Sequence, residues 1–157
     1  MSDSKLSKNY PHIFSFDGVE CASLQSLLQA FKFKNPEVQE YVCKHVGIFA
    51  KRRAKKRNKV WKEQQKLWWK DLAYNRDSAE YQKLIERVFE ALSKNQDFRN
   101  ALLATDNEPL VCTQIRPIKR SVLSGNEFCV QLAIVREKLH AETHRKATQP
   151  KKEGYVG

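Results

Sequence analysis

The stretch that decides the fold is DSAEYQKLIERVFEAL, residues 77–92. Asp77 and Glu80 have the spacing of a capping box, in which two side chains satisfy free N–H groups at the start of a helix. The apolar residues that follow recur every three or four positions, the period of one helix face. They are Tyr81, Leu84, Ile85, Val88, Phe89 and Leu92. The stretch therefore predicts an amphipathic helix with one buried face.

Signals on both sides extend this helical pattern over most of the chain. Asp17-Gly18 suits the positive φ values of a tight turn and predicts a β-hairpin over 13–22. Further helices are predicted over 24–33, 36–45, 48–57, 97–104 and 124–141, and a short strand over 110–115. Ser23, Asn35 and Ser124 are the expected caps of three of these helices. We therefore expect a mainly α fold, a single compact helical domain with a small N-terminal β-hairpin and one further short strand.

The chain has 157 residues, with 29 Lys and Arg against 18 Asp and Glu, a formal net charge of +11. This length corresponds to one domain, which we place at 13–141 between an N-terminal tail (1–12) and a basic C-terminal tail (142–157). No apolar run approaches the roughly 18 residues of a membrane span, and the first residues do not form a secretory signal. We expect a cytoplasmic protein with no membrane partner. The positive charge favours a polyanionic partner.

Motifs for metal and nucleotide binding are missing. The four cysteines stand far apart without a Cys-x-x-Cys pair, so a zinc site is not supported and reduced thiols are expected. His140 and His144 are four residues apart, but no third ligand stands at a suitable spacing. There is no Walker loop and no Gly-x-Gly-x-x-Gly. We therefore expect neither a metal nor a cofactor.

Residues 51–62 contain eight basic residues in twelve. Such a density can neutralise several phosphates of a nucleic acid and release their counterions. A solvated helix face is the alternative interpretation. The residues that we expect to contact DNA are Lys55, Lys56, Arg57 and Lys59.

Three tryptophans lie at the end of this run and just beyond it. Aromatic rings beside basic residues can stack on bases. Trp61, Trp68 and Leu72 also recur with the spacing of a helical core face. We expect Trp68 in the core and leave Trp61 and Trp69 open between the two roles.

The helix predicted over 24–33 carries a polar stripe beside its apolar one. Gln25, Gln29 and Lys32 stand at i, i+4 and i+7, so they share one face. A desolvated lysine loses its proton more easily and can attack a carbonyl-like carbon to form a Schiff base. The alternative is a solvated lysine at the end of a helix, where cations are favoured. From spacing alone this alternative is the more ordinary one.

The segment FDGVECASLQSLLQAFKF, residues 16–33, resembles the opening signature of the NADAR family. That signature is a short strand pair, a Ser-x-Glu element and then Gln-Ala-x-Lys-Phe. Shorter matches in the same order continue to about residue 139, near Gly47, Trp61, Arg76 and Glu127. The resemblance implies a mainly helical fold and hydrolysis of an N-glycosidic bond. The short length of the chain is similar to that of members carried by tailed bacteriophages.

The function that this resemblance implies is removal of ADP-ribose from guanine bases in DNA, which counters a DarT-type toxin. The partner would be ADP-ribosylated DNA, and the net charge of +11 favours DNA over a free metabolite. Two alternatives stay open. One is an N-glycosidase of small riboflavin-pathway intermediates, and the other is a non-catalytic nucleic-acid-binding module.

The resemblance also implies the roles of individual residues. Lys32 would be the nucleophile that takes the ribose C1 as a Schiff-base adduct. Gln25 occupies the position of an acidic residue of the family, so Glu127 or Glu20 would supply the carboxylate. The remaining roles follow from chemistry: amides hold ribose hydroxyls, cations neutralise a pyrophosphate and an indole stacks on a base. The residues expected in these roles are Gln25 and Gln29, Lys51 and Arg76, and Trp61 or Trp69.

Overall fold

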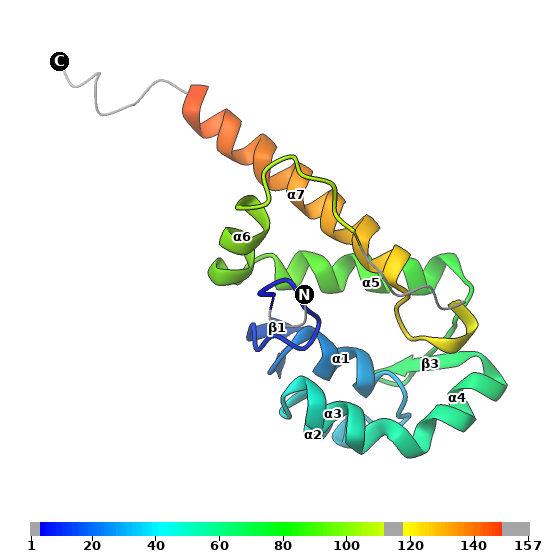
Figure 1. Cartoon of the computed structure of the whole chain (residues 1–157). Helices are drawn as coiled ribbons and strands as arrows, with labels where there is room; N and C mark the ends of the chain where they lie inside the picture. Colours follow the sequence, from blue (N-terminus) through cyan, green and yellow to red (C-terminus); the bar gives the residue numbers. More distant parts are fainter. Residues whose placement is uncertain (1–3, 112–117, 149–157) are drawn as a thin grey trace.

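The structure is a computed structural model that describes residues 4–111 and 118–148. It is mainly helical with a small N-terminal β-hairpin, which confirms the expected fold class. Figure 1 shows α1 to α4 and the strands in one half of the molecule and α5 to α7 in the other. The helices are α1 (Leu24–Ala30), α2 (Pro36–Cys43), α3 (Gly47–Ala54), α4 (Asn58–Gln64), α5 (Ala79–Leu92), α6 (Gln96–Leu103) and α7 (Gly125–Thr148), with single 3-10 turns η1 (Lys55–Arg57) and η2 (Ile118–Arg120). The strands are β1 (Phe14–Phe16), β2 (Val19–Cys21), β3 (Lys66–Trp69) and β4 (Leu72–Asn75).

The first hairpin forms as predicted. Strands β1 and β2 pair antiparallel, and Asp17 and Gly18 turn the chain with φ values of 48° and 80°. Ser23, Asn35 and Ser124 cap the next helices with their side chains, as expected. Helix α5 begins one residue later than predicted, because the hydroxyl of Ser78 accepts the hydrogen bond from the N–H of Tyr81.

The tryptophan-rich segment forms a second hairpin, where helical core spacing was predicted. Helix α4 ends at Gln65, which has a left-handed φ of 51°, and strand β3 follows. The β3–β4 turn places Lys70 and Asp71 at φ values of 46° and 70°. Such turns are ordinarily signalled by Asn-Gly or Asp-Gly, so Lys-Asp gave no signal. Trp68 is buried as expected, but it lies on a strand.

Other boundaries differ from the prediction. Leu72 is 60% exposed and is not part of the core. Residues 110–111 form no strand, and the rest of the strand predicted over 110–115 lies outside the described residues. Helix α7 continues to Thr148, so the basic segment predicted as a tail from residue 142 starts within this helix.

Helix α1 lies at the centre of its half of the molecule, and all seven of its residues are buried. Helices α2 and α3 pack against it, and the N–H of Trp68 donates to the carbonyl of Phe31 just beyond its end, at 2.8 Å. The N-terminal segment covers its start, since the N–H of Gln25 donates to the carbonyl of Lys8 at 2.9 Å. Residues 4–12 are therefore part of the folded domain, although a tail was predicted. The polar side chains of α1 are held inside the protein by this arrangement.

Two further expectations concern the redox state of the cysteines and the absence of a membrane-spanning helix. Cys21 and Cys43 are buried free thiols, but Cys129 is disulfide-bonded, so the expectation of reduced thiols is wrong for Cys129. Among the described residues, no helix is both long enough and apolar enough to cross a membrane.

Candidate functional site

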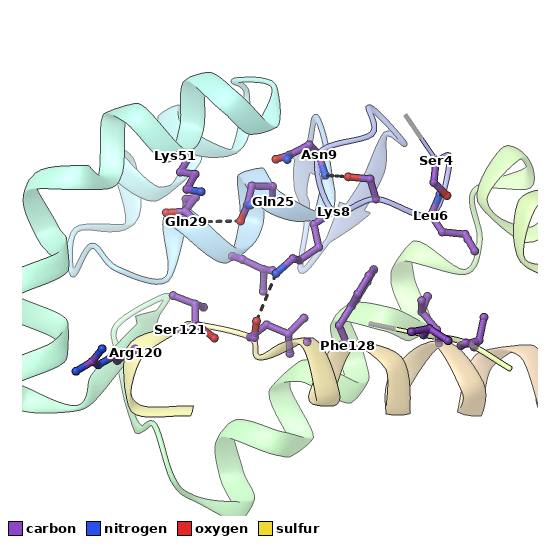
Figure 2. Close-up of a pocket in the computed structure, with 18 of the residues that line it drawn as sticks. Ser4, Leu6, Lys8, Asn9, Gln25, Gln29, Lys51, Arg120, Ser121 and Phe128 are labelled. Carbon is purple, nitrogen blue, oxygen red and sulfur yellow. Dashed lines mark hydrogen bonds between the residues drawn. The ribbon is translucent and has the colours of Figure 1, made fainter. Parts of the chain in front are cut away.

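A pocket of about 560 Å³ lies between α1, the N-terminal segment, α4 and the segment leading into α7 (Figure 2). Its walls bring together five of the residues that the sequence analysis selected for catalysis or substrate binding. These are Gln25, Gln29, Lys32, Lys51 and Trp61. The other polar residues in the lining are Ser4, Ser7, Lys8, Asn9, Asn58, Lys62, Thr105, Glu108, Arg120 and Ser121.

The two glutamines of α1 are buried in this pocket, at 7% and 5% exposure. Gln29 Nε2 donates to Gln25 Oε1 at 2.8 Å, which leaves Gln29 Oε1 as an acceptor without a partner in the described structure. The hydroxyl of Ser121 is also buried and unpartnered, and the two residues enter the pocket from different walls (Figure 2). A buried polar atom without a hydrogen bond costs about 1–3 kcal/mol. Both atoms are therefore suited to the hydroxyl or amide groups of a ligand.

Lys32 follows α1 and is only 6% exposed. Its Nζ donates to Asn58 Oδ1 at 2.6 Å, and the indole N–H of Trp61 points to the same oxygen at 3.4 Å. Burial, together with the positive charges of Lys62 and Lys51, lowers the pKa of Lys32 from 10.5 to about 8. The solvated lysine considered above is therefore excluded. A sizeable fraction of this amine is unprotonated in mildly alkaline solution.

The pocket carries an excess of positive charge. Its described lining contains five cationic side chains and one carboxylate, that of Glu108. Lys8 reaches across to donate to the carbonyl of Leu123 at 3.4 Å, while Lys51, Lys62 and Arg120 are exposed at the rim. An excess of one sign of charge in a cleft concentrates ligands of the opposite sign. The pocket therefore favours an anionic ligand with polar groups at its inner end.

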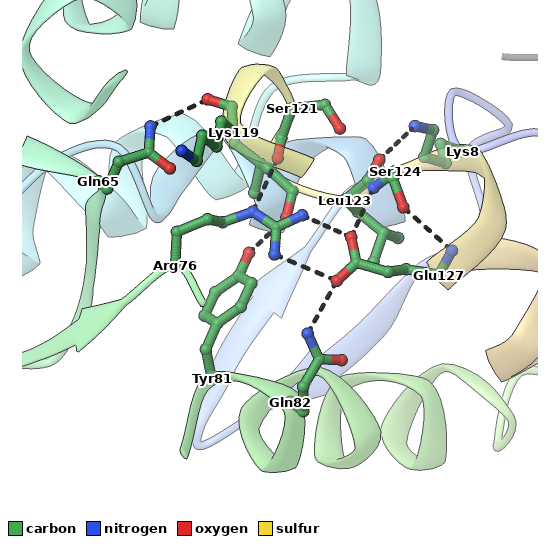
Figure 3. A network of polar contacts seen from close by, with 11 residues as sticks. Lys8, Gln65, Arg76, Tyr81, Gln82, Lys119, Ser121, Leu123, Ser124 and Glu127 are labelled. Carbon is green, nitrogen blue, oxygen red and sulfur yellow. Dashed lines mark hydrogen bonds and ion pairs between the residues drawn. The ribbon is translucent and has the colours of Figure 1, made fainter. Parts of the chain in front are cut away.

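Arg76 and Glu127 do not line the pocket, and their expected substrate roles need correction. Arg76 is fully buried, and its two Nη atoms donate to Glu127 Oε1 and Oε2 at 2.5 and 3.1 Å (Figure 3). Its Nε donates to the carbonyl of Ser121 at 2.8 Å. Both carboxylate oxygens of Glu127 are thus occupied by a cation within the protein. The pair fastens one pocket wall instead of contacting a pyrophosphate or serving as a free carboxylate.

Further hydrogen bonds complete this network. Glu127 also accepts from Gln82 Nε2 and from the N–H of Ser124, each at 2.8 Å. Burial alone would raise the pKa of Glu127, but the hydrogen bonds from Arg76, Ser124 and Gln82 outweigh it and hold that pKa below its usual range. The hydroxyl of Tyr81 donates to the carbonyl of Val122 at 2.7 Å. The segment before α7 is therefore held in place at several successive residues.

The two tryptophans left open occupy different places. Trp69 lies outside the pocket lining, where its indole donates to Asp17 Oδ2 at 2.8 Å and its ring packs on Phe16 and Phe31 with centroids 5.6 Å apart. Trp69 is only 2% exposed within the described structure, so its ring cannot stack on a base. Trp61 lines the pocket but is only 1% exposed, so it forms a wall. Glu20, the other carboxylate considered, is exposed on β2 and does not line this pocket.

The basic run divides into two groups. Lys55, Lys56 and Lys59 are exposed on η1 and α4 outside the pocket, where they stay candidates for contacting DNA. Arg57 is half-buried, and its Nε donates to the carbonyl of Lys32 at 3.0 Å. Its guanidinium also lies 5.9 Å from the ring centroid of Trp68. Arg57 therefore fastens the end of α1.

Several pocket residues were not found from the sequence. Lys8 and Asn9 lie in the segment predicted as a tail, and Arg120 and Ser121 lie far from any motif. Asn58 was detectable in principle, because it is the one uncharged polar residue within the basic run at 51–62. Its neutral amide accepts from Lys32 without stabilising the ammonium form as a carboxylate would.

Gly47, the first residue of α3, allows α3, the N-terminal segment and α1 to pack closely together. A Cβ at this position would lie 2.7 Å from Asn9 Oδ1, 3.0 Å from Asn9 Cα and 3.1 Å from Gln25 Cβ. Gly47→Ala gains at most about 1 kcal/mol of helix propensity, whereas overpacking costs about 1–3 kcal/mol. We expect a net loss of about 1–2 kcal/mol in the free energy of unfolding, measured by urea titration. The control is Ile48→Ala at an exposed neighbouring residue, which should change the free energy of unfolding by less than about 0.5 kcal/mol. If Gly47→Ala is as stable as wild type, the close packing around Gly47 is contradicted.

Comparison with known proteins decides the family. A family model described as Bacteriophage protein GP30.3 matches residues 1–137. The chain belongs to this phage protein family. A relative in Enterobacteria phage T4, titled "Uncharacterized 17.1 kDa protein in Gp30-rIII intergenic region", is 26% identical over 129 residues, which cover 80% of this chain and 84% of the relative. No solved structure matches the chain.

The resemblance to the NADAR family is wrong. The model that matches nearly the whole chain is that of the GP30.3 phage proteins, and no NADAR model matches. The expectation of a phage protein is confirmed. Every role that rested on the resemblance alone loses that support, whereas the shared face of Gln25, Gln29 and Lys32 was inferred from spacing.

Proposed function

We propose that this GP30.3-family protein is a lysine-dependent glycosidase that cleaves the N-glycosidic bond of a phosphate-bearing ribosyl substrate. The observation that carries this proposal is the amine of Lys32, which is buried in a pocket of amides and cations. Lysine amines become nucleophiles when desolvation or neighbouring cations lower their pKa. Both causes act on Lys32, whose pKa is about 8.

The reaction would begin with attack of the neutral Nζ of Lys32 on the ribose C1. The C1–N bond to the base then breaks, and its electron pair and a proton go to the base nitrogen. The amine loses a proton as the sugar ring opens to a Schiff base, and the ring oxygen takes up a proton. Water then adds to C1, which releases the sugar and restores the lysine. Overall, one water is consumed, as a hydrolysis requires.

The other pocket residues suit binding roles. Gln29 Oε1 and the hydroxyl of Ser121 have no hydrogen-bond partner among the described residues and can bond the sugar hydroxyls. Lys51, Lys62 and Arg120 at the rim can neutralise phosphate groups. Glu108 is the one carboxylate in the described lining and can carry the proton to the departing base.

Residues outside the pocket bear on whether the released base belongs to a nucleic acid or to a small metabolite. Removal of ADP-ribose from guanine in DNA fits this substrate class, but it no longer has the support of a family resemblance. The exposed Lys55, Lys56 and Lys59 on η1 and α4 favour a nucleic-acid substrate over a small riboflavin-pathway intermediate. We place this activity in the cytoplasm of the infected host.

The rival function is a non-catalytic nucleic-acid-binding module. One observation favours it, because the pocket offers few groups that can transfer a proton. Gln25 presents an amide at the inner end of the pocket, and the described lining has a single carboxylate. The two functions differ in what they do to a substrate. Purified protein would be incubated with ADP-ribosylated oligonucleotide, free ADP-ribosyl guanosine and small phosphorylated N-glycosides, and the products weighed by mass spectrometry. Release of a free base supports the glycosidase, and binding without release from any of these supports the module.

The rate of base release should depend on pH through Lys32. The reactive form is the neutral amine, whose population increases as pH rises through its pKa of about 8. We therefore expect kcat/KM to rise about tenfold per pH unit below that value and to level off above it. The measurement is a pH–rate profile between about pH 6 and 10. A profile that is flat across this range would remove Lys32 as the titrating nucleophile.

A further inference from the structure

Two aromatic side chains on α2 and α3 face solvent, each with an arginine over its ring. Tyr41 is 50% exposed and Phe49 is 55% exposed. The guanidinium carbon of Arg53 lies 5.4 Å from the ring centroid of Tyr41, and that of Arg52 lies 5.7 Å from the ring centroid of Phe49. We call these four residues the aromatic–arginine surface. None of them lines the pocket described above.

The charge around the α3 part of this surface is of one sign, whereas the exposed Glu37 and Glu40 lie beside Tyr41 on α2. Residues 44–62 contain nine Lys or Arg and no Asp or Glu, in a chain of net charge +11. The nearest carboxylates in sequence are Glu37 and Glu40 on α2 and Glu63 at the end of α4. No ion pair in the described part of the chain includes Arg52 or Arg53. The surface is therefore complementary to a polyanion.

We propose that the aromatic–arginine surface binds single-stranded nucleic acid. Unpaired bases can stack on the ring of Phe49, while the arginines and the neighbouring lysines contact the phosphates. The ring of Tyr41 offers less free area, because the imidazole of His45 packs against it with ring centroids 4.5 Å apart. A duplex keeps its bases stacked on each other, so it can use only the charges. This inference goes beyond the proposed function, since it concerns a surface outside the pocket and does not require Lys32.

A membrane surface is the other polyanion to consider. Helices that lie in a membrane interface present a wide apolar face to the lipid. Helix α3 is eight residues long, and the large apolar side chains exposed on it and at its N-cap are Val46, Ile48 and Phe49. Arginine pairing with Phe49 further reduces the apolar area. The surface is thus better suited to flat bases than to acyl chains.

The test uses the full chain and fluorescence anisotropy with a labelled oligothymidylate of about 20 nucleotides and a duplex of the same length. Phe49→Ala should weaken binding to the single strand about fivefold or more, because it removes a stacking ring. Its affinity for the duplex should change less than about twofold. Phe49→Trp should retain single-strand affinity, because an indole also stacks. Arg52→Gln with Arg53→Gln should weaken both and flatten the salt dependence.

Matched controls lie on other parts of the molecule. Val130→Ala removes an apolar side chain on α7 that is 47% exposed, and Lys83→Gln with Lys94→Gln removes two exposed charges on or just after α5. Thermal unfolding checks that each variant is folded.

Three results would overturn the proposal. The first is unchanged single-strand affinity in a folded Phe49→Ala variant. The second is an equal loss on single strand and duplex, which would mean that the ring does not stack on bases. The third is loss of binding to vesicles of phosphatidylserine and phosphatidylcholine in Phe49→Ala without any effect on the oligonucleotide, which would assign the surface to membranes.

Discussion

Replacing Lys32 with alanine is expected to lower the rate of base release by at least about 10³-fold, because the proposed reaction loses its nucleophile. Borohydride added during turnover should reduce the Schiff base and leave a stable adduct in the wild type. Peptide mass spectrometry should locate this adduct on Lys32. Lys32→Arg provides a second test, since it keeps the positive charge but cannot form a Schiff base. Lys94→Ala, just after α5 and outside the pocket, should retain both the rate and the adduct.

Measuring the stability of Lys32 variants distinguishes a loss of the nucleophile from a loss of the fold. The pKa of Lys32 is about 8 in the folded protein and 10.5 without the protein environment, so folding disfavours its protonated form. This cost is fully present below about pH 8 and fades as pH rises towards 10.5. A Lys32→Met variant should therefore gain stability relative to wild type at pH 7 and lose that gain near pH 10.

Base release that survives in Lys32→Ala, or an adduct on another residue, would contradict the proposed role of Lys32 as the nucleophile.

The local features of the fold could be predicted because their causes lie within a few residues. Asp17-Gly18 turns the first hairpin, and Ser124 with Glu127 forms the expected capping box. The same reasoning placed Gln25, Gln29 and Lys32 on one face of a helix over 24–33; α1 ends at Ala30 and Lys32 lies just beyond it, but all three side chains line the pocket.

Features that depend on distant partners could not be predicted in this way. The second hairpin turns at Lys70-Asp71, which carries no recognisable turn signal. Spacing also cannot show that Arg76 meets Glu127, because the two are 51 residues apart in sequence. Short motifs spread over a chain can match a family by local composition alone, which explains why the NADAR resemblance failed although the helix face did form.

The Arg76–Glu127 pair provides the prediction with the largest effect on stability. The side chains are 0% and 14% exposed, so removal of either leaves an uncompensated charge inside the protein. We expect Arg76→Ala to lower the free energy of unfolding by about 3–5 kcal/mol, a large part of the roughly 5–15 kcal/mol typical of a domain. Because the pair fastens the wall that includes Ser121, ligand binding in the pocket should weaken as well. Urea titration at neutral pH measures the first effect.

An exposed ion pair in the same chain is the matched control. Arg87 and Asp17 are joined at 2.9 Å, but their side chains are 50% and 32% exposed. Arg87→Ala should therefore cost no more than about 1 kcal/mol.

Acid adds a second signature of the buried pair. Its hydrogen bonds hold the pKa of Glu127 below 4.5 in the folded protein. The stability that Glu127 contributes is thus present above about pH 4.5 and is lost as pH falls through its folded pKa. Arg76→Leu combined with Glu127→Leu removes both charges, so it should destabilise less than the sum of the single variants and lose this acid dependence. Strictly additive losses, or an Arg76→Ala variant no less stable than Arg87→Ala, would show that the two side chains do not act as a buried pair.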